Sequence, residues 1–248
     1  MNVVVTGGGT IAPVDDVRVL TNVSSGRLAA AISEAFLDRG ASVWHIHARS
    51  AQVPLKRRAQ FALDAADPSA ELDRLTRLRR RWLDQRDRLH LVPLETGTVA
   101  DYAATLKATL AARPIDVAVL AMAVSDFEPE PYPGKLSSQS ESLVVRCRRT
   151  PKVIRSVRDW APSIYLVGFK LLSNVPSEEL LRRAEEACRV NRADLTVAND
   201  LKTLRQGRHT LHLVRPGTEA ETLEPGDDLA DRLVARIAAL AEAAFPPS

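Results

Sequence analysis

The residues best suited to bind an anion lie near the N-terminus, in the stretch VVVTGGGT at residues 3–10. Gly7, Gly8 and Gly9 directly follow a β-branched apolar run, which is typical of a buried parallel strand. Glycine has no Cβ atom, so its backbone can approach a ligand that a side chain would keep away. We therefore expect a phosphate or nucleotide site to begin at this turn.

A second polar group, Asn22, Ser24, Ser25 and Gly26, follows after an extended loop. Serine is a preferred N-cap, and apolar residues then recur at helical spacing up to Phe36, so a helix is expected to begin at Ser24 or Ser25. The free N–H groups and the dipole of a helix N-terminus favour an anion. An ordinary capped helix after a surface loop is the alternative interpretation.

Asp126, Phe127 and Lys135 follow the strongest strand signal, IDVAVLAMAV at residues 115–124. Asp126 could order a nucleotide hydroxyl or Mg²⁺, and Phe127 could cover a base. Lys135 lies in a proline-rich loop, from which a mobile lysine could close over phosphates. The alternatives are a turn cap beside a core phenylalanine, and an ordinary surface lysine.

The elements that must position these residues alternate between strands and helices. Strands are expected at residues 3–5, 42–47, 89–94, 115–124, 142–148, 164–169, 195–198 and 209–214, and helices at 24–36, 69–87, 98–113, 151–160, 177–191 and 229–240. A capping box at Ser177 and Glu179 is expected to begin the helix at 177–191. This alternation predicts parallel βαβ units, and ligands of such sheets bind at the carboxyl ends of the strands.

The predicted fold is thus α/β, a Rossmann-like and mostly parallel sheet with helices on both faces. Residues 1–248 are expected to form a single domain, with a basic helical insert at 52–88 and a flap at 128–141. A nucleic-acid surface on the insert is disfavoured because acidic residues dilute its arginines, so a solvated amphipathic segment is expected.

Composition limits the class of protein. The 248 residues are 45% hydrophobic with a net charge of +3, which is ordinary for a soluble domain and argues for neither nucleic-acid nor membrane partners. No apolar run reaches the roughly 20 residues of a membrane span, and a secretory leader is not expected. Cys147 and Cys188 are expected to be buried free thiols, which favours a cytoplasmic protein.

Two other site chemistries remain open. Gly7, Gly9 and Ala12 fit a dinucleotide fingerprint, but no helix follows at once, and Arg49 stands where NAD-binding proteins carry an acid. An NADP-dependent Rossmann-like oxidoreductase is therefore the alternative function, and a non-catalytic nucleotide-binding regulator is a third. His45 and His47 could ligate a metal, although structural histidines are favoured because no third ligand is near.

Seven motifs in order resemble phosphopantothenoylcysteine synthetase, the phosphopantothenate–cysteine ligase family of coenzyme A biosynthesis. They are VVVTGGGT, VRVLTNVSSGR, AMAVSDF, GKLSS, RRTPKVI, VGFKLL and NRADLTVANDL. The insert, with ARSA and TVADY, resembles the eukaryotic enzymes, whereas GFKLL and NRADLTVANDL resemble the stand-alone bacterial form. The decarboxylase domain fused to many bacterial relatives has no counterpart, so no flavin is expected.

The resemblance implies amide formation between 4′-phosphopantothenate and L-cysteine through an acyl-nucleotidylate, with CTP or ATP as nucleoside triphosphate and Mg²⁺ as cofactor. It implies catalytic roles for Asn22 and Lys135, and substrate binding by Arg18 and Asn22. The implied nucleotide-binding residues are Gly8, Gly9, Ser24, Ser25, Gly26, Ala121, Met122, Asp126, Phe127, Thr150 and Phe169. Asp126 is the candidate metal ligand, and a homodimer that completes the substrate site across its interface is expected.

One departure from the family pattern concerns the nucleotide. Fused relatives carry two lysines on the helix before the last motif, where this chain has Ala187 and Asn191. The arginines that could substitute for them are Arg182, Arg183, Arg189 and Arg192. The sequence therefore leaves the choice between CTP and ATP open.

Overall fold

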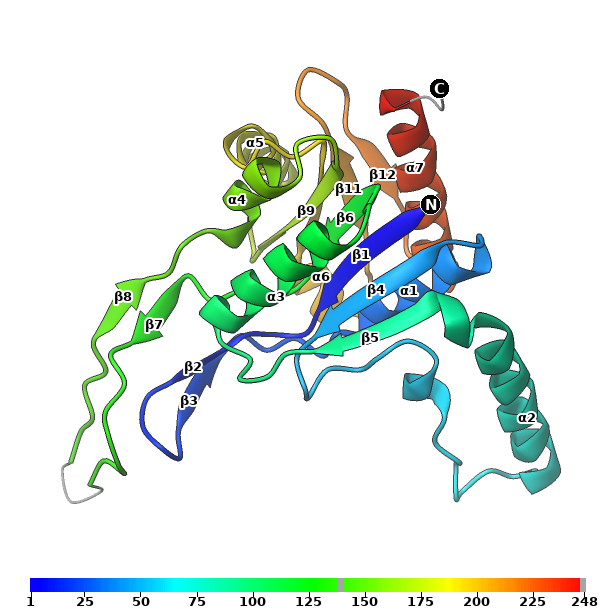
Figure 1. The fold of residues 1–248 in the computed structure, drawn as a ribbon, viewed down its shortest axis with the longest axis horizontal. Helices are drawn as coiled ribbons and strands as arrows, with labels where there is room; N and C mark the ends of the chain where they lie inside the picture. Colours follow the sequence, from blue (N-terminus) through cyan, green and yellow to red (C-terminus); the bar gives the residue numbers. More distant parts are fainter. Residues whose placement is uncertain (138–140, 246–248) are drawn as a thin grey trace.

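A computed structural model describes residues 1–137 and 141–245 of the chain. Its centre is an eight-stranded sheet in the order β12-β11-β10-β9-β6-β1-β4-β5 (Figure 1). The parallel strands are β1 (Asn2–Gly7), β4 (Ser42–His47), β5 (Leu89–Pro93), β6 (Val117–Leu120), β9 (Tyr165–Leu172) and β10 (Leu195–Asp200). At one edge, β11 (Leu211–Val214) and β12 (Glu221–Leu223) continue the sheet antiparallel.

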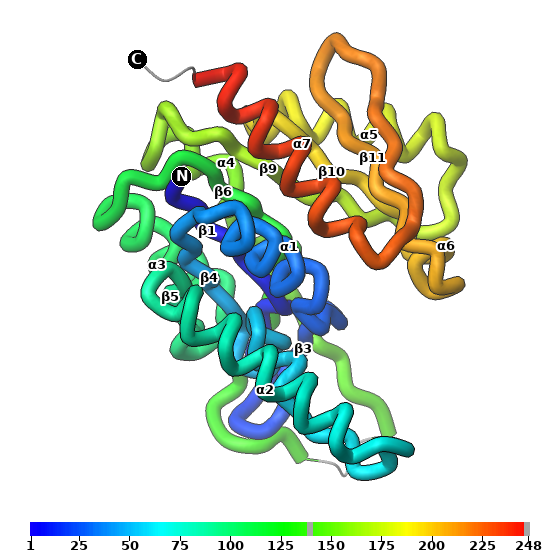
Figure 2. The backbone as a smooth tube through the Cα atoms, turned by 90° about the vertical axis from the view of Figure 1, so that its right-hand side faces the viewer, coloured from blue at the N-terminus to red at the C-terminus, as the bar shows by residue number. Residues whose placement is uncertain are grey.

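Helices cover both faces of this sheet, as predicted. One face carries α1 (Arg27–Asp38) and α7 (Leu229–Ala244), which lie side by side in Figure 2. The other carries α3 (Val99–Ala112), α4 (Val153–Trp160) and α5 (Ser177–Val190), with the short α6 (Leu201–Arg205) after β10. Among the described residues no helix has the length and apolar character needed to span a membrane.

The strands are apolar on both sides because both faces of the sheet are buried. Val3 and Val5 contribute to the core beneath α1 and α7, whereas Val4 and Ala118 contribute to the core beneath α3 and α4. Burying one valine or leucine side chain contributes roughly 1.5–3 kcal/mol, so these two cores hold the strand ends in fixed positions.

The sheet has a switch point between β1 and β6. From β1 the chain proceeds outward to β4 and β5, and after crossing back to β6 it proceeds the other way to β9 and β10. Ligands of doubly wound sheets bind outside the carboxyl ends of the strands at such a point. The glycine turn leaves β1 here, beside the segment that follows β6.

Two pairs of short strands leave the body at this edge and extend together in Figure 1. The first pair is β2 (Ile11–Pro13) and β3 (Val19–Thr21), and the second is β7 (Phe127–Pro129) and β8 (Cys147–Arg149). We call residues 11–21 the first arm, and residues 127–137 and 141–149 together the second arm. The sequence predicted only loops at β2, β3 and β7, because strands of three residues give no periodic signal.

Several predicted boundaries are wrong. Helix α1 begins at Arg27 after a left-handed Gly26, and α5 follows Pro176 with no side-chain cap, so the Ser177 capping box does not form. Strand β6 covers only Val117–Leu120, since the chain then turns and pairs again only at Ala123.

Differences also occur near the arms and at the end of the chain. In place of a strand at 142–148 only β8 forms, and Cys147 on it is exposed rather than buried. The flap expected at 128–141 includes 138–140, which lie outside the described residues. Neither α6 nor β12 was predicted from the sequence.

The insert contains a short 3₁₀ turn (Lys56–Arg58) and α2 (Pro68–Gln85), capped by Asp67. It attaches to α1 through Glu34, a carboxylate only 3% exposed. Arg57 Nε lies 2.8 Å and Arg58 Nη2 3.3 Å from the Glu34 carboxylate. Ion pairs with Glu34 therefore hold the insert against α1, and the outer face of the insert is exposed to solvent.

Candidate functional site

The glycine turn and the start of α1 approach each other directly. Gly8 (φ 91°) and Gly26 (φ 73°) are both left-handed, and a Cβ atom on either would lie within 2.9 Å of the Ala51 Cβ. A Cβ on Gly7 would lie 2.6 Å from that of Ala29. We expected the three glycines to let a ligand approach the backbone. On the side where a Cβ atom would lie, however, other residues of the protein fill the space.

Asn22 lies against the same turn. The position of a Gly9 Cβ is 2.4 Å from the Asn22 carbonyl oxygen, and Thr21 Oγ1 donates to the Thr10 carbonyl at 3.0 Å. The β2–β3 pairing thus returns the chain to the glycine turn. Asn22 itself is exposed, so its amide side chain is accessible to a ligand.

The N-terminus of α1 has no side-chain cap. Gly26 offers no side-chain cap, and the first turn contains no acidic residue. Ser25 Oγ accepts only a long hydrogen bond of 3.4 Å from the Arg27 amide, while the Ser25 carbonyl accepts one from the Gln52 amide at 2.9 Å. Ser24 is half-buried beside it. The helix dipole and the first amides therefore favour an anion here.

The segment after β6 is fixed to the glycine turn by its backbone. The Ala123 amide donates to the Gly8 carbonyl at 2.8 Å, and the Thr10 amide donates to the Ala123 carbonyl at 3.1 Å. Met122 was expected to offer its backbone to the nucleotide, but its amide donates to Thr6 Oγ1 at 3.2 Å and its side chain is buried. This amide is thus already used within the protein.

The other predicted nucleotide residues divide between two places. Ala121 and Phe169 are half-buried against the core beneath α1. Asp126, Phe127 and Thr150 line a hollow of about 460 Å³ at the base of the second arm. Its remaining lining residues are Arg149, Pro151, Lys152 and Arg155. Three cations thus surround a site where the sequence had identified only a carboxylate, a ring and a threonine.

Three hydrogen bonds connect this hollow to Thr10, the residue that follows the glycine turn. Thr150 Oγ1 donates to the Ser125 carbonyl at 2.5 Å, and the Thr150 amide donates to the Asp126 carbonyl at 3.1 Å. The Ser125 amide in turn donates to Thr10 Oγ1 at 3.0 Å. Thr10 and Ser125 were missed as positioning residues, because nothing in their spacing indicates that they meet.

Arg18 and Lys135 lie together on the arms. The Asp15 carboxylate accepts from Arg18 Nη1 at 2.7 Å and from the Leu136 amide at 3.0 Å. Burial alone would raise the pKa of Asp15, but these amide hydrogen bonds and the Arg18 guanidinium hold it below its usual value. Lys135 is exposed, and none of the described contacts joins it to the glycine turn or the hollow.

The histidines of β4 are structural. His45 is fully buried, with Nδ1 2.8 Å from Ser33 Oγ, and burial together with neighbouring His47 lowers its pKa to about 3. The described residues contain no cluster of three His, Cys, Asp or Glu side chains that could hold a metal. Arg49, the residue that left NADP open, donates to the Leu94 and Glu95 carbonyls at 3.2 and 3.1 Å.

The arginines that could replace the missing lysines are all in ion pairs. Arg182 and Arg183 pair with Glu179 at 2.8 and 2.5 Å. Arg189 pairs with Glu185 at 2.9 Å, and Arg192 pairs with Asp159 at 2.7 Å. Each therefore already has a carboxylate partner within the chain.

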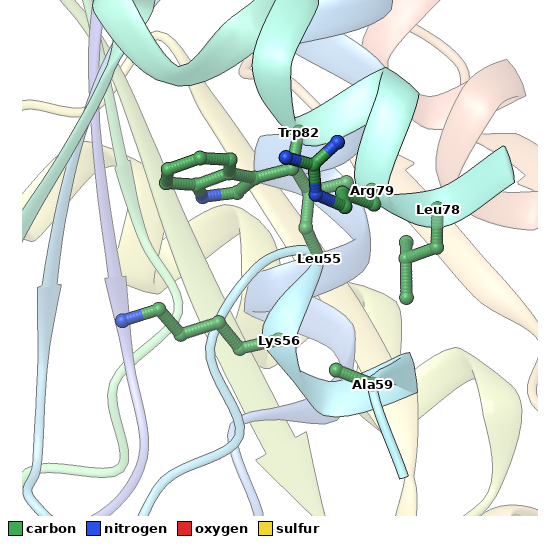
Figure 3. A pocket seen from close by; sticks show the side chains of 6 residues that line it. All are labelled: Leu55, Lys56, Ala59, Leu78, Arg79 and Trp82. Carbon is green, nitrogen blue, oxygen red and sulfur yellow. The ribbon is translucent and has the colours of Figure 1, made fainter. Parts of the chain in front are cut away.

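A second hollow, of about 220 Å³, lies in the insert (Figure 3). Figure 3 shows Trp82, Arg79 and Leu78 of α2 facing the turn that carries Leu55, Lys56 and Ala59. Its lining is almost entirely apolar and includes no predicted site residue.

The fold defines a doubly wound α/β protein, in which the uncapped start of α1 and the hollow lined by three cations follow the carboxyl ends of the central strands. The family model for the DNA/pantothenate metabolism flavoprotein C-terminal domain matches residues 1–75 and 83–240. The chain belongs to this family.

Relatives and solved structures agree with this assignment. Mouse phosphopantothenate–cysteine ligase is 30% identical over 94% of this chain and 81% of its own length. The coenzyme A biosynthesis bifunctional protein CoaBC of Thermococcus kodakarensis is 30% identical over 86% of this chain. The chain spans only 40% and 44% of the two archaeal bifunctional proteins that it matches.

Among solved structures, the DNA/pantothenate metabolism flavoprotein of Streptococcus pneumoniae is 26% identical, with a TM-score of 0.75 over 96% of this chain and 99% of that one. A mutant of Cab2 in complex with phosphopantothenate-cysteine has a TM-score of 0.83 at 22% identity, over 98% and 87% of the two chains. Because the identity to Cab2 is only 22%, that similarity supports the fold and nothing further.

Proposed function

We propose that this protein is a ligase of coenzyme A biosynthesis that joins 4′-phosphopantothenate to L-cysteine. The observation that carries the proposal is the close approach of the Asn22 backbone carbonyl to Gly9: Asn22 is exposed next to the glycine turn, and α1 begins nearby without a side-chain cap. Similarity to the mouse ligase over 94% of the chain supports it.

The proposed reaction has two steps. A carboxylate oxygen of phosphopantothenate attacks the α-phosphorus of a nucleoside triphosphate, and the bond to the bridging oxygen breaks, releasing pyrophosphate. The cysteine amine then attacks the acyl carbon, loses a proton, and displaces the nucleoside monophosphate. Because both leaving groups are anions, the chain must supply positive groups rather than a nucleophile.

Each site residue has a role in this proposal. Asn22 holds the acyl-nucleotidylate, with Gly8, Gly9, Ser24, Ser25 and Gly26 around the anion beside it. The family resemblance implies that Ala121, Met122, Asp126, Phe127, Thr150 and Phe169 cradle the nucleotide, although the Met122 amide already donates to Thr6 Oγ1. Arg18 binds phosphopantothenate, and Lys135 closes onto the phosphates.

Mg²⁺ would neutralise the triphosphate and polarise the α-phosphate when bound. Asp126 is the candidate protein ligand, because its side chain is 59% exposed and phosphates supply the other oxygens of such sites; in this structure its carboxylate pairs with Lys152. We propose CTP or ATP as the nucleotide, and both must be tested. A cytoplasmic location is supported by the two free cysteines.

A homodimer is part of the proposal. Strand β3 is exposed at all three positions, and Val17, Val19 and Leu20 are 63%, 48% and 43% exposed. Because Arg18 and Lys135 lie on the same arms, docking of a second copy there would bring them toward a nucleotide site. Light scattering of the purified chain should give twice the mass of one chain.

The experiment that tests the function measures pyrophosphate release with Mg²⁺ and either CTP or ATP. Release should require 4′-phosphopantothenate, and amide product should appear only after cysteine is added. The Asn22→Ala variant, altered at an exposed residue, should remain folded and lose turnover. If the folded protein releases no pyrophosphate with either nucleotide, the ligase proposal fails, and NADP binding would be measured next.

A further inference from the structure

The hollow at the base of the second arm has an unbalanced charge. Arg149, Lys152 and Arg155 line it together with a single carboxylate, Asp126. Lys152 Nζ forms an ion pair with Asp126, and both side chains are about half exposed. The lining of the hollow therefore contains three cations and one carboxylate.

The other two cations of the hollow have no such partner in the part of the chain that the structure describes. Within residues 1–137 and 141–245, no carboxylate pairs with the guanidinium of Arg149 or of Arg155. Neighbouring arginines differ: Arg148 pairs with Glu128 at 3.1 Å and Arg158 pairs with Asp194 at 2.5 Å. Like charges that share one hollow repel each other, and an anion between them would remove that repulsion.

The backbone adds to the positive potential. Lys152 directly precedes α4, whose N-terminus has no side-chain cap and no acidic residue in its first turn. Arg155 lies in that first turn. Phe127, which is 51% exposed and is the cross-strand partner of Arg149, adds an aromatic ring to the lining. A hollow of about 460 Å³ is large enough for a polyphosphate group with its attached sugar.

We propose that Arg149, Lys152 and Arg155 bind the β- and γ-phosphates of the nucleoside triphosphate and retain the pyrophosphate as it leaves. This assignment rests on the proposed ligase function. In the free protein Lys152 pairs with Asp126, and a bound polyphosphate gives Lys152 a new partner, so the Asp126 carboxylate becomes available to a cation.

This role has a defined place in the reaction. When the carboxylate oxygen bonds to the α-phosphorus, the electron pair of the broken bond passes to the bridging oxygen of pyrophosphate. The charge that develops there lies next to three fixed cations. Their contribution should therefore appear in nucleotide affinity and pyrophosphate inhibition, and not in the binding of phosphopantothenate.

The test uses the full chain and two variants, Arg149→Ala and Arg155→Ala, separately and combined. Arg148→Ala is the matched control, because it removes a neighbouring arginine that does not line the hollow. Calorimetry measures the binding of inorganic pyrophosphate and of each nucleotide with Mg²⁺. Each lost charged hydrogen bond should weaken pyrophosphate binding about 10- to 100-fold, and Arg155→Lys should restore part of it.

The outcomes separate this assignment from the ligase proposal. Weakened pyrophosphate binding in both variants, with phosphopantothenate KM changed less than twofold, supports it. Equal pyrophosphate binding in wild type, control and variants overturns it, even if the wild type is an active ligase. If the wild type lacks ligase activity but binds pyrophosphate through these residues, only the proposed reaction fails.

Discussion

Replacing Gly9 with alanine should test whether the contact between the glycine turn and Asn22 is needed for activity. The new Cβ atom would lie 2.4 Å from the Asn22 carbonyl oxygen, whereas ordinary contact begins at 3.4 Å, so about 1 Å of movement is required. Gly9 has no positive φ, so alanine itself is compatible with the local backbone. The steric clash is therefore the dominant effect.

The expected cost has two parts. Overpacking of this kind destabilises proteins by roughly 1–3 kcal/mol, which urea unfolding would measure. A misplacement of about 1 Å at a catalytic residue can lower a rate roughly 100-fold, so pyrophosphate release should fall far more than stability.

Gly168→Ala is the matched control for this prediction. Its Cβ would lie 2.9 Å from Ile154 Cδ1, the mobile end of a side chain, and Gly168 likewise has no positive φ. The activity of this variant should fall by no more than a few-fold relative to wild type. If Gly9→Ala kept activity within twofold of wild type, the inferred role of the Asn22 contact would be wrong.

Two further predictions concern stability. Glu34→Gln should destabilise the fold by about 3 kcal/mol in urea, because it leaves Arg57, 10% exposed, without its buried partner; an unchanged midpoint would contradict this. The folded pKa of His45 is about 3 against 6.5 unfolded. As pH falls below 6.5 the unfolded state therefore binds the proton first, and stability should decline by up to about 1.4 kcal/mol per pH unit. His45→Leu should flatten this decline, and an identical pH profile would refute the assignment.

The sequence determined the α/β class, the parallel strands, the helices on both faces and the family. Each of these depends on local patterns: runs such as Val3 to Val5 are apolar because both faces are buried, and a helix was expected at 69–87, where α2 forms. The motifs also identified Asp126, Phe127 and Thr150, which the fold brings into one hollow.

Only the tertiary structure decided what surrounds those residues. The glycines of the turn are buried against Ala29, Ala48 and Ala51, and the Met122 amide bonds to Thr6, a residue 116 positions away. The net charge of the hollow depends on which of the nearby arginines form ion pairs with carboxylates outside it. Such pairings join segments far apart in the chain, and they depend on the packed distances between elements, which local spacing does not encode.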